Sequence, residues 1–212
     1  MAYNRFPITN VEGDLVAQHR DPDEKLYASL ELNQVAFPKT GMVVSQTPLG
    51  AAFTKAAPCE NGMWVVADKS KGIIDAPAAV TDTPIGIVYT TEKEYDREHY
   101  GLQRFGRKIA GDYPRVGILG VGDTVTTNCL QYSTSVFAND EALLEALKKD
   151  LSVAGNALYV VPGNASDATA SSAKAVPAIV KSAPGTGIYG RITKFYTIPN
   201  GGLGVKYQII RV

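Results

Sequence analysis

The feature that most constrains this 212-residue chain is a succession of short apolar segments separated by turn-forming residues. The segments are rich in β-branched and aromatic side chains, which favour strands. Glycine, proline, asparagine and aspartate fill the gaps and favour tight turns. Many short strands joined in this way predict a mainly β fold, a sandwich or barrel of short antiparallel strands. The predicted strands are 42–45, 63–67, 85–90, 116–119, 123–127 and 157–161.

The C-terminal end carries the clearest local signal, which is that of a β-hairpin. Segments 188–198 and 203–212 flank the sequence Pro-Asn-Gly-Gly at 199–202. Asn-Gly supplies the positive φ angles that a tight hairpin turn requires. Between positions 205 and 209 apolar and polar residues alternate, so one face of the second strand is expected to be buried.

Two segments predict short helices. Asn139 is placed to cap a helix over 140–149, in which the acidic residues come first and the lysines last, as the helix dipole favours. Its leucines fall at helical spacing. The sequence Thr-Glu-Lys-Glu at 91–94 has the form of a capping box for a second helix that would stop at Gly101. A charged loop would have a similar composition.

The chain is expected to divide into an N-terminal arm and lead-in, residues 1–40, and a β-rich domain, residues 41–212. The first thirty or so residues are polar, are interrupted by proline and glycine, and lack a sustained apolar period. Within the domain, residues 163–187 are dominated by alanine and serine and contain no aromatic residue, which predicts a long loop or flap. This loop either reaches a partner or is a tolerated insertion, and a short helix near 168–175 is an alternative.

The charge balance argues against two classes of partner. Lysine plus arginine (21) equals aspartate plus glutamate (21). Nucleic-acid binding requires a basic surface that neutralises phosphates, and an anionic membrane requires a polybasic patch. The chain also has neither a signal-type apolar region near Met1 nor a run of 18 apolar residues. We therefore expect a protein made in the cytoplasm that binds no nucleic acid and no membrane.

The sequence contains no pattern typical of catalysis. Cys59 and Cys129 form no CxxC motif, and are expected to be ordinary semi-buried thiols, although a disulfide stays open. The two histidines, His19 and His99, have no second histidine at metal-ligand spacing. There is no GxSxG elbow, and the glycine-rich stretch 117–122 matches no phosphate-binding loop. We expect no catalytic residue, cofactor or metal ion.

Four residues are candidate contacts with a partner. Tyr3, Arg5 and Phe6 would anchor the N-terminal arm to a neighbouring protein, together with the 163–187 loop. Packing on the chain's own domain is an equal alternative for this arm. Trp64 lies in an apolar segment, which favours a place in the core or at a subunit interface over a sugar-stacking platform.

Three segments carry a resemblance to a known family. They are Glu-Asn-Gly-Met-Trp-Val-Val at 60–66, Thr-Pro-Ile-Gly-Ile-Val at 83–88 and Val-Gly-Ile-Leu-Gly-Val-Gly-Asp-Thr-Val at 116–125. Their rhythm resembles that of the head decoration, or capsid cement, proteins of tailed bacteriophages. The resemblance covers about a third of the chain, and segments 91–107 and 163–187 depart from it.

The resemblance implies a non-catalytic virion structural protein on the capsid surface. It would bind the major capsid protein lattice, often as a homo-oligomer, and stabilise the expanded head. The departures leave a head fibre, a tail protein or another virion protein open. A carbohydrate-binding β module, with tyrosines and Trp64 lining a groove, is the rival from another class. An enzyme would require His99, Asp96 and Glu94 to converge in a pocket.

Overall fold

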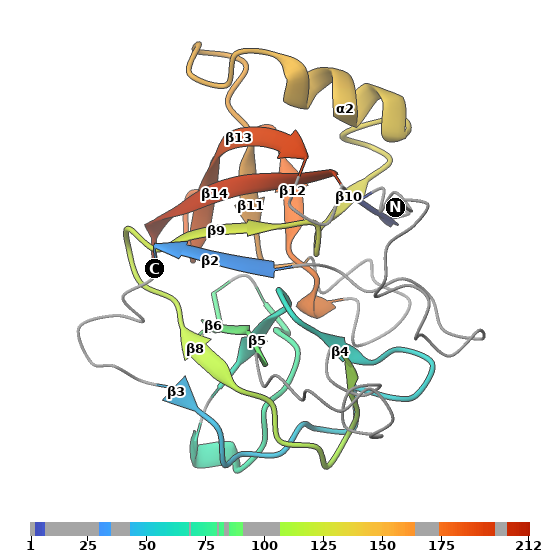
Figure 1. The fold of residues 1–212 in the computed structure, drawn as a ribbon, viewed down its shortest axis with the longest axis vertical. Coiled ribbons are helices and arrows are strands. Elements are labelled where there is room, and N and C mark those ends of the chain that lie inside the picture. The colour runs from blue at the N-terminus through green and yellow to red at the C-terminus, as the bar shows by residue number, and fades with distance from the viewer. Residues whose placement is uncertain are drawn as a thin grey trace.

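The computed structural model describes residues 3–6, 30–34, 43–67, 69–79, 81–82, 85–90, 107–163, 174–197 and 203–212. These residues form a mainly β structure of short strands in two principal sheets, with α2 as the α-helix of the described part (Figure 1). The predicted fold class is therefore confirmed. All six strands predicted before the hairpin are present, although each is one or two residues shorter than its apolar segment.

The larger sheet has eight strands in the order β1-β10-β12-β11-β13-β14-β9-β2. Neighbouring strands are antiparallel, except for the parallel pair β10 and β12. In chain order the strands are β1 (Tyr3–Arg5), β2 (Leu30–Gln34), β9 (Thr124–Thr127), β10 (Gln131–Ser133), β11 (Tyr159–Val161), β12 (Ala178–Val180), β13 (Tyr189–Thr197) and β14 (Leu203–Arg211).

The smaller sheet has four antiparallel strands in the order β3-β8-β6-β5. They are β3 (Val43–Val44), β5 (Trp64–Val66), β6 (Ile85–Val88) and β8 (Val116–Ile118). A two-stranded ribbon, β4 (Cys59–Glu60) with β7 (Arg107–Lys108), and the short 3-10 helix η2 (Lys69–Lys71) complete the described elements beside it.

The smaller sheet is buried on both faces. Trp64 and Ile87 face a core shared with the eight-stranded sheet, whereas Val65 and Val116 face a second core on the opposite side. Alternate residues of a strand point to opposite faces, so a strand with apolar residues at every position is buried on both. The smaller sheet therefore forms the middle layer between two hydrophobic cores.

A hydrogen bond between two aromatic side chains connects the sheets inside the first core. Trp64 Nε1 on β5 donates to Tyr207 Oη on β14 at 3.0 Å, and both side chains are fully buried. Their rings meet edge to face, with centroids 5.9 Å apart. Burial raises the pKa of Tyr207, which keeps its hydroxyl protonated. Each polar group thus satisfies the other where water is excluded.

The predicted C-terminal hairpin and the first predicted helix are confirmed. β13 and β14 pair antiparallel, with the irregularity of a bulge between Ile192 and Lys194, and Val205 and Tyr207 are fully buried as the alternation indicates. Helix α2 (Asp140–Lys148) begins after Asn139, whose side chain accepts a hydrogen bond from the Ala142 amide at 2.9 Å. The second predicted helix, at 91–101, lies outside the described residues.

Two expectations about chain organisation need correction. Residues 3–5 and 30–34, assigned to the arm and lead-in, are strands β1 and β2 of the larger sheet. Part of the predicted 163–187 loop is β12, in the interior of that sheet between β10 and β11, and its Ile179 is 1% exposed. These strands are too short to show an apolar period in the sequence. Residues 164–173 of the predicted loop lie outside the described part.

The bond between Trp64 and Tyr207 generates a stability prediction. Tyr207→Phe leaves the Trp64 N–H without its partner in the core, which should lower the free energy of unfolding by about 1–3 kcal/mol. Trp64→Phe should cost more, because it also leaves a cavity. Measured by urea unfolding, the loss in free energy of unfolding of the double variant should be smaller than the sum of the losses of the two single variants. Additive losses would show that the two groups do not act as a pair.

Candidate functional site

Three of the four predicted contact residues come together at one edge of the larger sheet. Tyr3 and Arg5 belong to β1, which pairs with β10 in the register Tyr3 with Ser133 and Arg5 with Gln131. Phe6 follows directly, and its amide donates to the Leu130 carbonyl at 2.8 Å. We call residues 3–6 the docked N-terminal segment. Trp64 lies on β5 of the smaller sheet and shares only the first core with Phe6.

The large apolar side chains of the prediction are already buried by the chain itself. Phe6 is 1% exposed and belongs to the first core, and Trp64 is 0% exposed. Both side chains are enclosed within this structure, which confirms the place in the core that the sequence favours for Trp64, and contact of either residue with a partner stays a prediction. The reading of Trp64 as a sugar-stacking platform fails because its side chain is enclosed. Large aromatic residues contribute most where they are fully enclosed, which is why the core takes them.

A hydrogen-bond chain connects the docked segment with helix α2. Asn4 Nδ2 donates to Tyr132 Oη at 3.2 Å, and the Tyr132 hydroxyl donates to the carboxylate of Asp140 in the first turn of the helix. Tyr132 is fully buried on β10. The docked segment therefore completes a polar network whose other members lie about 130 residues further along the chain.

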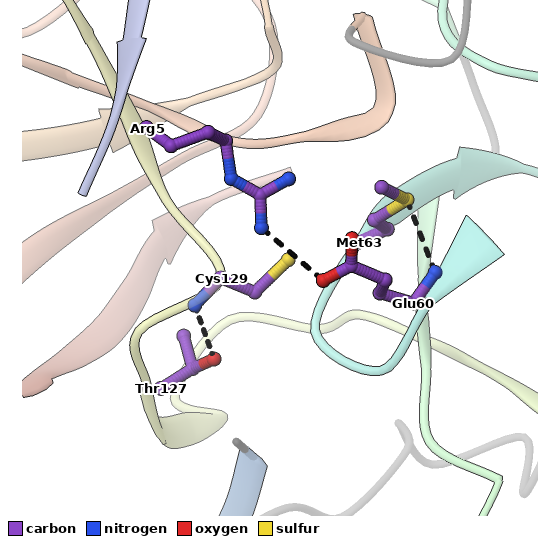
Figure 2. Close-up of polar contacts among 5 residues, drawn as sticks. All are labelled: Arg5, Glu60, Met63, Thr127 and Cys129. Atoms are coloured by element: carbon purple, nitrogen blue, oxygen red, sulfur yellow. Dashed lines mark hydrogen bonds and ion pairs between the residues drawn. The ribbon is translucent and has the colours of Figure 1, made fainter. Parts of the chain in front are cut away.

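Arg5 connects the edge of the larger sheet with the β4 ribbon (Figure 2). Its Nη2 lies 3.3 Å from Glu60 Oε2, and the two side chains are 39% and 13% exposed. The Glu60 amide faces Met63 Sδ at 3.3 Å, which fixes the turn after β4. A partly exposed ion pair contributes modestly to stability, so the pair mainly sets the position of the segment.

The guanidinium of Arg5 also points toward the Cys129 thiol, whose backbone amide donates to Thr127 Oγ1 at 2.9 Å (Figure 2). Burial raises the pKa of Cys129 to about 12 even though Arg5 acts in the opposite direction. Burial likewise raises the pKa of Cys59 well above its usual range. Thiolates are the reactive form of cysteine, so neither thiol is a nucleophile at neutral pH.

Both cysteines are free and belong to the second core, which confirms them as thiols. The prediction that they are semi-buried is wrong, because both side chains are fully buried. Within the described residues, no group of three or more histidine, cysteine, aspartate or glutamate side chains is placed to hold a metal ion. Four residues of the sequence analysis lie outside the described part of the chain: His19, Glu94, Asp96 and His99. The enzyme hypothesis depends on the last three of them and therefore stays a prediction.

Two neighbouring pockets of about 430 and 440 Å³ meet beside helix α2 and share Val136 and Lys181. Lys181 Nζ lies 4.9 Å from the centre of the Phe137 ring, which is 2% exposed. The pockets are lined by aliphatic side chains, by lysine and by polar groups such as Ser182 and Glu145, and the Phe137 ring is not open for stacking on a flat ligand.

Three exposed aliphatic side chains lie where the β8–β9 turn meets the end of β14, and we call them the apolar corner. They are Val121, Ile210 and Val212, which are 65%, 41% and 58% exposed. The Gly122 amide donates to the Ile209 carbonyl at 2.8 Å, which holds the turn against β14. Figure 1 shows this turn and the C-terminus at the same side of the molecule. Sequence alternation marks Ile210 as outward-facing, but only the fold brings the turn that carries Val121 against the end of β14.

Comparison of the chain with protein-family models, with curated protein sequences and with solved structures gave no match.

Among the described residues, no helix has both the length and the apolar character needed to cross a membrane.

The buried thiols generate a prediction about pH. The folded-state pKa of Cys129, about 12, lies above its unfolded value of about 8.5, so its stabilising contribution is complete below pH 8.5 and is lost as pH rises toward 12. The free energy of unfolding should fall by about 1.4 kcal/mol per pH unit for this thiol above pH 9. Urea unfolding at pH 7, 9 and 10 measures the slope.

Cys129→Ala is the control for this titration. It removes the thiol together with some packing, so stability should be lower at pH 7, but the decline between pH 9 and 10 should be shallower than in the parent protein. The difference between the two slopes of unfolding free energy against pH removes the contribution of the lysines and tyrosines, which titrate in both proteins. Equal slopes in the two proteins would contradict the assignment of a buried, protonated thiol.

Proposed function

We propose that the chain is a non-catalytic virion structural protein that decorates and stabilises a phage capsid by packing against the lattice of the major capsid protein. The observation that carries the proposal is the apolar corner of Val121, Ile210 and Val212. Single exposed aliphatic residues are ordinary, but three of them on a turn and a strand end that hydrogen-bond to each other favour a protein-binding surface.

The positions of the three family-like segments support the proposal. Segments 60–66 and 83–88 contain the neighbouring strands β5 and β6, and 116–125 contains β8, which pairs with β6, and the start of β9. They are thus contiguous in space and form most of the middle layer. The β8–β9 turn that presents Val121 belongs to the same unit, so the proposed contact lies on the part of the chain that carries the resemblance.

A decoration role requires burial of surface and no catalytic group. The free energy of decoration would come from burying apolar surface that neither partner buries alone. Burial of a fully exposed valine contributes about 1.5–3 kcal/mol, and binding to the assembled lattice alone stabilises that lattice by mass action.

Co-sedimentation with capsids built from the major capsid protein of the same phage tests the proposal. The parent protein should saturate at a fixed number of copies per capsid and raise the capsid melting temperature. Val121→Asp, which puts a charge in the apolar corner, should weaken binding roughly tenfold or more, since the lost burial exceeds about 1.4 kcal/mol.

Val153→Asp is the matched control. Val153 is 49% exposed, but it lies in the turn after helix α2 and not in the apolar corner. This variant should bind as the parent does. If Val121→Asp and Val153→Asp both bind like the parent, the apolar corner is not the contact surface. If the parent protein does not pellet with capsids at all, the decoration role is wrong, and assembled tails and head fibres become the structures to examine.

A further inference from the structure

The docked N-terminal segment is separated from the strand that follows it in sequence. β1 and β2 are consecutive in the chain, but they occupy opposite edges of the eight-stranded sheet. Consecutive strands usually lie next to one another in a sheet. The connection between them is therefore unusual, and it places the first strand of the chain on a site built by much later residues.

Among the described residues, the contacts of the docked segment are with residues far away in sequence. Asn4 bonds to Tyr132, Arg5 pairs with Glu60, and the Phe6 amide bonds to Leu130. The nearest of these partners is 55 residues away. Because these partners lie 55 or more residues away in sequence, the same segment from a second copy would make the same contacts.

The site for this segment is incomplete when it is empty. Phe6 is 1% exposed within the first core, so removing it opens a cavity the size of a phenyl ring between the sheets. β10 would lose its antiparallel partner and become an edge strand with unpaired backbone groups. The site therefore needs an occupant, either the chain's own segment or an identical one.

The length of the connection permits both arrangements. Residues 7–29 join the segment to β2, and at about 3.3 Å per residue they reach up to about 75 Å. Strands lie about 4.8 Å apart, so the opposite edges of an eight-stranded sheet are at most about 34 Å apart. The connection is thus about twice as long as one copy requires.

We propose that the docked N-terminal segment is exchanged between copies of this chain, so that β1 of one copy pairs with β10 of another and links them into an oligomer. Identical contacts are made in either arrangement, so the local concentration of copies decides between them. A formal net charge of zero leaves little long-range repulsion between copies. The exchange does not depend on capsid binding.

A cross-linking experiment with two different variants tests the exchange. Tyr3 and Ser133 are directly paired residues of β1 and β10, and opposite residues of this kind approach closely enough for a disulfide after small adjustment. One tagged protein carries Tyr3→Cys, and a second protein with a tag of different mass carries Ser133→Cys. They are co-expressed without capsids, purified together, oxidised, and separated on a non-reducing denaturing gel.

The expected result is a heterodimer band that contains both tags and disappears on reduction. Each variant expressed alone shows the background from the native thiols, which are buried in the folded chain. The double variant Tyr3→Cys/Ser133→Cys is the control for register, because it forms the cross-link whichever copy supplies β1.

Two outcomes would overturn the proposal. If the double variant cross-links within one chain and the mixture gives no heterodimer, the segment docks only on its own copy. If the double variant forms no cross-link at all, β1 does not pair with β10 in this register and the exchange has no basis. Either result leaves the capsid assay of the apolar corner unaffected, so the two proposals succeed or fail separately.

Discussion

The fold depends most on the contact between Trp64 and Tyr207 in the first core. This contact joins the four-stranded sheet to the eight-stranded sheet through one buried hydrogen bond and an edge-to-face packing of the rings. Neither group would tolerate burial without the other, because an unpaired indole N–H or phenol in a dry core costs free energy. The pair therefore fixes the relative position of the sheets, and the second core is built on the other face of the sheet that Trp64 belongs to.

The docked N-terminal segment provides a second connection between the layers. Phe6 enters the first core, Arg5 reaches Glu60 on the β4 ribbon, and Asn4 joins the network that leads to helix α2. Four residues thus touch three separate parts of the molecule. The segment is short, and its site is made by residues 60–140, which is the arrangement expected of an element that binds as a ligand does and not as a continuation of the local chain.

The groups most capable of chemistry in the described residues are used for structure. The thiols of Cys59 and Cys129 are enclosed in the second core, and the aromatic residue best suited to hold a ligand, Trp64, is enclosed in the first. The exposed surface includes the aliphatic side chains of the apolar corner, the Tyr113 ring and the pockets beside α2. This division of buried and exposed groups favours association with other proteins, which is the basis of the proposed capsid role.

The sequence by itself determined the elements whose causes are local. The alternation from Val205 to Ile209, the Asn-Gly turn and the Asn139 cap predicted the hairpin and the helix, because period and capping act within a few residues. Strands β10 and β12 escaped prediction, because three residues show no apolar period. Gln131 on β10 is a polar residue that is buried, and its side chain donates to the distant Val176 carbonyl. The Arg5, Glu60 and Cys129 cluster, the burial of Phe6 and the apolar corner were decided by tertiary structure alone, because each joins residues that only long-range strand pairing brings together.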